Sequence, residues 1–145
     1  MAITTAMCAS FKQELLGGIH DLDTDILKMA LIQATPTGTY GASTTNYSDV
    51  TGDSDEATGT NYTAGGQTLD GATISLDGTT AIVDFTDEVF TNVTVSTSGC
   101  IIYNSSKANR AVCVIDFGGT VSATAGDLTI QFPTADATSA IIRIA

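Results

Sequence analysis

The sequence predicts an all-β protein: a single antiparallel β-sandwich or a jelly-roll-like barrel, with a short N-terminal α-helix and a long Gly/Thr/Tyr loop. Short runs that alternate apolar and polar residues recur over the second half of the chain, separated by Gly, Asp and Asn. Continuous apolar runs of strand length occur beside them. With 145 residues, of which 43% are hydrophobic, the chain can build the core of one domain spanning residues 1–145.

The N-terminal helix is expected over residues 6–16. Met7, Phe11 and Leu15 recur at intervals of four, and Cys8 lies beside them, so one apolar stripe follows the helix. A helix of about three turns is marginal in isolation and must pack on something. Two interpretations stay open: the helix packs on its own domain, or it docks on a neighbouring subunit.

The ends of this helix also have sequence signals. Thr5 is the expected N-cap, and the Gly17-Gly18 pair is the expected left-handed stop. We therefore treat residues 1–18 as an N-terminal helix or arm.

A strand over residues 26–33 and a long loop over residues 34–66 are expected next. The loop is rich in Thr, Ser, Gly and Asp, has no clear period, and carries three of the four tyrosines, Tyr40, Tyr47 and Tyr62. Tyrosine suits half-buried contacts, because its ring is apolar and its hydroxyl is polar. Either the loop touches a partner, or it folds back over the sheet.

The main β region is expected over residues 67–145. Asp77-Gly78 is a signal for a two-residue type I′ turn, which would pair Leu76 with Thr79 in a hairpin. One face of that hairpin would carry Ile74, Leu76, Ala81, Val83 and Phe85.

Four further segments read as strands. Residues 99–103 and 111–117 are nearly continuous apolar runs, which indicates strands buried on both faces. Residues 128–132 alternate, and residues 141–144 form the last strand. Cys100 and Cys113 would then be buried thiols, which one hairpin register would place opposite each other.

Charge argues against two classes of partner. The formal net charge is −11, and the five basic residues are scattered along the chain. A protein that binds nucleic acid or anionic membranes needs clustered positive charge, so we expect neither as a partner. The N-terminus lacks the regions of a signal peptide, and no apolar stretch approaches 18 residues, which predicts synthesis in the cytoplasm.

Catalytic groups are scarce, and we expect no catalytic residue and no cofactor. His20 is the single histidine, and no sequence signal brings it to Cys8, which belongs to the helix stripe.

Two acidic clusters are candidate metal sites. Asp21, Asp23 and Asp25 begin like a calcium loop, but Ile26 and Ile32 replace the required Gly and Glu. A solvated turn is the favoured interpretation, and a looser calcium site is the alternative. The second cluster, Asp53, Asp55 and Glu56, lacks ligand spacing, and we expect no metal.

Several segments together resemble a family of small structural proteins of tailed bacteriophages. They are Phe11–Leu16, Gly18–His20, Lys28–Ile32, Gly59–Gly66, Val83–Phe85 and Ile101–Asn104. The resemblance covers most of the chain and implies a capsid decoration or cement protein. Such proteins clamp the joints between major capsid subunits on the capsid exterior of the virion, commonly as trimers. One departure is the acidic stretch Asp53–Glu56, where relatives often carry Asn-Glu-Val.

This resemblance predicts the major capsid protein and further copies of the chain as partners. Six side chains from the helix stripe and the loop are the expected partner interface: Met7, Phe11, Leu15, Tyr40, Tyr47 and Tyr62. The alternatives are a tail, neck or fibre module, or an adhesin that binds host-surface carbohydrate. The absence of tryptophan counts against sugar binding. An enzyme, such as a hydrolase, is the third and least favoured class.

Overall fold

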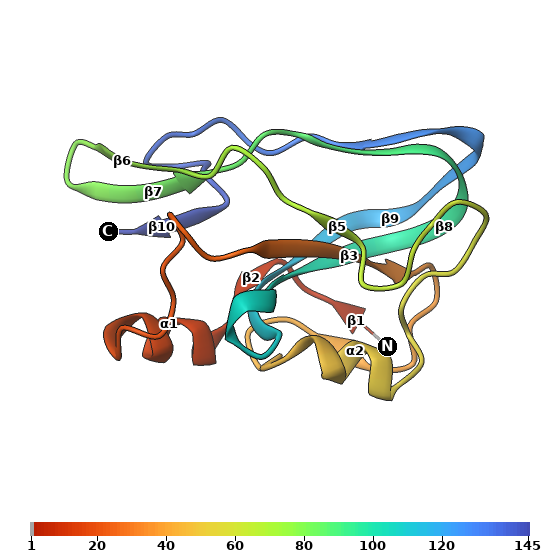
Figure 1. Ribbon diagram of the computed structural model, residues 1–145, viewed down its shortest axis with the longest axis horizontal. Helices are drawn as coiled ribbons and strands as arrows, with labels where there is room; N and C mark the ends of the chain where they lie inside the picture. Colours follow the sequence, from red (N-terminus) through yellow and green to blue (C-terminus); the bar gives the residue numbers. More distant parts are fainter. Residues whose placement is uncertain (1) are drawn as a thin grey trace.

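The computed structural model describes residues 2–145, and strands dominate it (Figure 1). Strands hold 48% of the residues and helical segments 12%, so the predicted all-β class is confirmed. The strands are β1 (Ala2–Ile3), β2 (Ala6–Met7), β3 (Leu27–Gln33), β4 (Thr39–Tyr40), β5 (Gln67–Thr68), β6 (Thr73–Asp77), β7 (Thr80–Asp84), β8 (Glu88–Asn104), β9 (Arg110–Ile130) and β10 (Ile142–Ile144). The helices are α1 (Ala9–Leu16), α2 (Tyr47–Gly52) and a 3-10 turn, η1 (Ser105–Lys107).

These strands form three sheets. The central sheet has the order β2-β9-β8-β3-β5, and a smaller sheet has the order β10-β7-β6; every pairing in both is antiparallel. β1 and β4 form a separate parallel pair. Within residues 2–145 the sheets do not close on themselves, so the expectation of a jelly-roll-like barrel is wrong.

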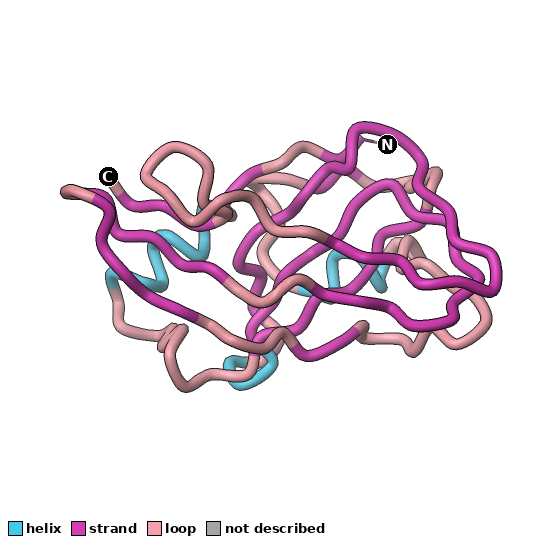
Figure 2. The backbone as a smooth tube through the Cα atoms, turned by 90° about the horizontal axis from the view of Figure 1, so that it is seen from above, coloured by secondary structure: helices cyan, strands magenta, loops and turns pink. Residues whose placement is uncertain are grey.

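The two longest strands, β8 and β9, form a ribbon that folds back over itself. Figure 1 shows the ribbon bending so that its far half lies over the central sheet, on the side of β6 and β7. The pairing register shifts several times along the ribbon, including between Thr97 and Gly99. Because bulges bend and twist a strand, these register shifts account for the bend in the β8–β9 ribbon. The helices lie on the opposite side of the central sheet, behind the strands in Figure 2.

The core lies around the three central strands. Residues 29–32 of β3, 100–103 of β8 and 111–114 of β9 are all buried. Both faces of each strand are covered, which explains why these runs are apolar without alternation. The prediction of strands buried on both faces is confirmed for residues 99–103 and 111–114, but residues 115–117 of the predicted run are only partly buried or exposed.

The start of the N-terminal helix differs from the expectation. Ala6 and Met7 pair with β9 as a strand, and α1 begins only at Ala9. Thr5 is not the N-cap, because its Oγ1 accepts a hydrogen bond from the Asp116 N–H at 2.9 Å. Pairing with β9 satisfies backbone groups at that edge, and this long-range gain overrides the local helical pattern. The helix ends as predicted, with Gly18 at a φ of +71°.

The β6–β7 hairpin exists, but its turn lies one residue further along. Asp77 pairs with Thr80, so the two-residue loop is Gly78-Thr79 and not Asp77-Gly78. Gly78 has a φ of +61°, whereas Thr79 is not among the positive-φ residues. This matches a type II′ turn, which needs a glycine only at its first central position. The pairing shift is two residues along β7, so the predicted apolar face keeps its members.

A close approach of loop to sheet makes Gly66 indispensable. A Cβ atom there would lie 1.7 Å from the Met29 carbonyl oxygen, and φ is +72°. Gly18 has a similar φ of +71° but open space around its Cα. We therefore expect Gly18→Ala to lower the free energy of unfolding by about 1–2 kcal/mol, the cost of left-handed backbone.

Gly66→Ala adds a steric clash to that cost and should destabilise by several times as much or prevent folding. Urea unfolding of the two variants measures the difference. Equal losses would show that the loop does not press on β3 at this point.

Candidate interaction surface

The long segment 34–66 is not structureless, because it contains β4 and α2. Asn46 caps α2: its Oδ1 accepts from the Ser48 N–H at 3.0 Å, while the Asp49 side chain accepts from the Asn46 N–H at 3.3 Å. The Asn46 Nδ2 also donates to the Ala108 carbonyl at 2.9 Å. The segment is thereby tied back to the turn between β8 and β9.

A buried carboxylate holds the first part of this segment. Asp55 is fully buried and accepts hydrogen bonds from the Thr37 and Gly38 N–H groups at 2.9 and 2.7 Å. It also accepts from the Tyr40 hydroxyl at 2.7 Å and from Gln33 Nε2 at 2.6 Å. Burial alone would raise the pKa of this carboxyl, but the hydrogen bonds lower it far below its ordinary value.

The next residue holds the second part. Glu56 accepts from the Tyr47 hydroxyl at 2.5 Å, the Tyr62 hydroxyl at 2.9 Å and the Gly65 N–H at 2.6 Å. The Tyr62 oxygen in turn accepts from the Leu31 N–H at 2.9 Å. Burial and the nearby carboxylate raise the pKa of both tyrosines, so both hydroxyls stay protonated and able to donate. The segment therefore folds back over the sheet, one of the two interpretations left open.

The expected interface residues do not gather on one surface. Phe11 and Tyr40 are buried inside the chain, at 0% and 1% exposure. Tyr47 and Tyr62 are half-buried and pack against the core. Only Met7 and Leu15 line a surface depression.

That depression is part of an apolar groove between α1 and the β10-β7-β6 sheet. Two adjoining hollows of about 450 and 350 Å³ share Leu15 and Ile144. We call the α1–β6 groove the surface formed by Leu15, Leu16, Ile74, Val83, Ile142 and Ile144. Leu16 is 93% exposed, and Ile74 and Ile144 are about half exposed, at 53% and 52%.

The register of the small sheet creates this groove. Ile74 lies opposite Val83, which lies opposite Ile142, so one row of apolar side chains crosses the sheet. The sequence predicted the apolar face of the hairpin, but not that its outer part would remain open. The groove depends on the pairing of β10 with β7, and no local sequence pattern predicts this long-range pairing.

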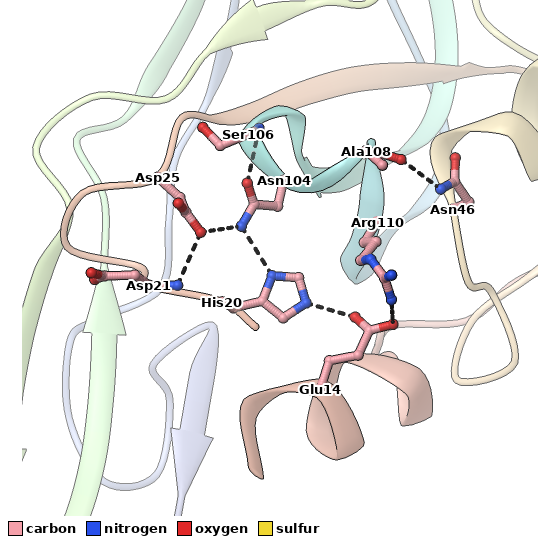
Figure 3. A network of polar contacts seen from close by, with 9 residues as sticks. All are labelled: Glu14, His20, Asp21, Asp25, Asn46, Asn104, Ser106, Ala108 and Arg110. Carbon is pink, nitrogen blue, oxygen red and sulfur yellow. Dashed lines mark hydrogen bonds and ion pairs between the residues drawn. The ribbon is translucent and has the colours of Figure 1, made fainter. Parts of the chain in front are cut away.

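A polar network fixes the wall of the groove that α1 provides (Figure 3). His20 Nε2 contacts Glu14 Oε2 at 2.6 Å, and Arg110 donates to the other Glu14 oxygen at 2.8 Å. Asn104 Nδ2 donates to Asp25 at 2.7 Å and lies 3.0 Å from His20 Nδ1, which assigns Nδ1 as acceptor. Burial alone would raise the pKa of Glu14, but hydrogen bonds from His20 and Arg110 lower it.

The network involves residues of two candidate sites from the sequence, the His20–Cys8 pair and the acidic cluster at Asp21–Asp25. His20 contacts Glu14 and Asn104, and no bond joins it to Cys8. The Cys8 thiol faces the Gly41 carbonyl, and burial raises its pKa to about 12. Asp25 accepts from the Asp21 N–H and from Asn104, as a structured turn would.

The structure also bears on the metal and disulfide expectations. Within residues 2–145, no group of three or more His, Cys, Asp or Glu side chains is placed to hold a metal ion. Cys8, Cys100 and Cys113 are free and buried, as expected. Cys100 lies opposite Ile115 and not opposite Cys113. No helix in the same residues is long and apolar enough to cross a bilayer.

Comparisons with protein-family models, with curated proteins and with solved structures found no match to this chain.

The Tyr62 hydroxyl both donates to Glu56 and accepts from Leu31, so removing it should cost more stability than removing the Tyr47 hydroxyl. Tyr62→Phe removes a donor to Glu56 and also leaves the buried Leu31 N–H without an acceptor. Tyr47→Phe also removes a donor to Glu56, but the nearby Gly65 N–H keeps Glu56 as its acceptor. We expect Tyr62→Phe to cost about 1–3 kcal/mol more than Tyr47→Phe, the penalty of one unsatisfied buried group. Denaturant unfolding at pH 7 measures both, and equal costs would contradict the role of Tyr62 as acceptor.

The lowered pKa of Asp55 predicts acid sensitivity. A carboxyl with a depressed folded pKa stabilises the fold fully above its unfolded pKa of about 3.9, and this contribution is lost as pH falls through the folded value. The unfolding free energy should therefore drop below about pH 4, and Asp55→Asn should be less stable at pH 7 and lack this part of the drop. Asp23→Asn, on an exposed turn, is the charge-matched control. An Asp55→Asn profile parallel to wild type would refute the assignment.

Proposed function

We propose that this chain is a structural protein of a tailed-bacteriophage virion, and that it acts as a cement or decoration protein on the capsid exterior. In this role it binds the joints between major capsid subunits, as a homotrimer. The observation that carries the proposal is the α1–β6 groove, a concave and mostly apolar surface bordered by Lys12 and Arg143 on a strongly acidic chain. The sequence resemblance supplies the class of partner.

The exposure of the groove supports a role in binding. Leu16 has 93% of its surface open to water, and Leu76, beside the groove on β6, has 72%. Clustered exposed apolar side chains on a folded protein mark interaction surfaces, and the centres of such interfaces are poor in charge. The net charge of −11 keeps the chain soluble and opposes non-specific association through the exposed groove.

The scaffold suits a joint-binding protein. We class it as a β-sandwich in which the folded β8–β9 ribbon contributes to both layers. A protein that binds only the assembled shell stabilises that shell by mass action, and many copies at equivalent joints add their effects. The tied-down loop and the polar network under α1 keep the binding surface in shape before contact, which limits the entropy lost on binding.

Binding to purified shells tests this function. We expect the chain to bind expanded capsids that lack it, and Leu16→Glu to weaken binding by about tenfold to a hundredfold, because the most exposed apolar side chain of the groove is replaced by a charge. Val121→Glu, a partly exposed residue of β9 outside the groove, is the control. Circular dichroism verifies that both variants fold.

Equal binding of Leu16→Glu and wild type would contradict the role of the groove. Copy number in purified particles tests the location: hundreds of copies fit the shell, whereas a dozen or fewer assign the chain to the tail, neck or fibre.

A further inference from the structure

The small sheet ends in an unprotected edge. β6 forms one border of the β10-β7-β6 sheet, and within residues 2–145 it pairs only with β7. All five of its residues, 73–77, are exposed. Proteins usually protect such edges with charged side chains, above all lysine, with proline or with a bulge; β6 has a single charge, Asp77 at its end, and no lysine, proline or bulge. The edge is therefore able to accept another strand.

The turn determines which backbone groups face outward. Asp77 and Thr80 flank the two-residue loop, so the turn hydrogen bond joins them. In an antiparallel pair, hydrogen-bonded and non-hydrogen-bonded positions alternate. Asp77, Ser75 and Thr73 therefore direct their N–H and C=O groups toward β7. Ile74 and Leu76 direct theirs toward solvent.

We propose that β6 pairs with β6 of a second copy of this chain, antiparallel, about a two-fold axis at Ser75. Each Ile74 then lies opposite Leu76 of the other copy, and the outward groups of both residues form about four backbone hydrogen bonds. Both residues are more than half exposed in the single chain, at 53% and 72%. The pairing brings these apolar side chains together and extends one apolar face over six strands.

Charge selects this register. Asp77 is the only charged residue of β6, and the pairing sets it opposite Thr73 of the other copy. The two Asp77 carboxylates lie at opposite ends of the ladder, and each already accepts the Ala137 N–H at 2.7 Å. A register that placed the two carboxylates face to face would add like-charge repulsion and lose the Ile74–Leu76 pairs. The strand is self-complementary, as an isologous two-fold contact requires.

This contact shares Ile74 with the α1–β6 groove but is made by the backbone edge of β6, so it requires neither capsid binding nor a three-fold association. Two single-cysteine variants test it. All three native thiols are buried, so a cysteine on β6 is the only exposed one. At Ser75, next to the axis, paired Cβ atoms would lie about 4.5–5.5 Å apart, close enough for a disulfide after small adjustment.

Thr73→Cys is the matched control on the same strand and face. In the proposed register the two Thr73 residues are four positions apart along the ladder, about 13 Å, which is too far for a disulfide. We expect Ser75→Cys to form a covalent dimer under mild oxidation at least ten times faster than Thr73→Cys, and the double variant Thr73→Cys/Asp77→Cys to form one as well. Non-reducing electrophoresis and mass spectrometry measure the yields.

Equal rates for the two single variants would indicate random collision and overturn the proposal. The absence of any Ser75→Cys dimer would also overturn it. Either result would leave the effect of Leu16→Glu on capsid binding unchanged, so failure here is distinguishable from failure of the proposed function.

Discussion

Two adjacent carboxylates, Asp55 and Glu56, hold the structure in the form described. The segment 34–66 runs over the sheet with little regular structure, so its backbone and tyrosine donors need acceptors. Asp55 accepts donors from the first part of the segment, and Glu56 accepts donors from the second part. Without these acceptors, buried N–H and hydroxyl groups would be left unpaired at a cost of about 1–3 kcal/mol each.

This constraint makes three of the tyrosines part of the fold. The tyrosines that composition assigns to an interface are committed to Asp55 and Glu56, so the segment acts as a cover for the sheet. The open apolar surface lies elsewhere, between α1 and the β10-β7-β6 sheet. There Leu16 and Ile74 stay exposed, while the network of Glu14, His20 and Asn104 holds the helix in place. The segment 34–66 thus forms a fixed cover over the sheet, and the α1–β6 groove is the exposed apolar surface.

The sequence predicts elements whose signals are local, and fails where distant segments decide. The doubly buried strand over residues 99–103 and the helix stop at Gly18 follow from local pattern, and the structure confirms both. The start of α1 does not, because pairing with β9 draws Met7 into a strand. The acidic stretch at Asp55 is visible in the sequence, but its donors lie 15 to 22 positions away along the chain. The groove depends on the pairing of β10 and has no local signal.

Amide hydrogen exchange of the free protein tests the central claim most directly, because exchange reports how firmly each segment is held. We predict that peptides covering the backbone donors at Thr37, Gly38 and Gly65 exchange as slowly as the β3 strand. Exchange at Thr37 and Gly38 should become fast in Asp55→Asn, and exchange at Gly65 should become fast in Glu56→Gln. Fast exchange across residues 34–66 in the wild-type protein would contradict it, since the tyrosines would then be free to reach a partner.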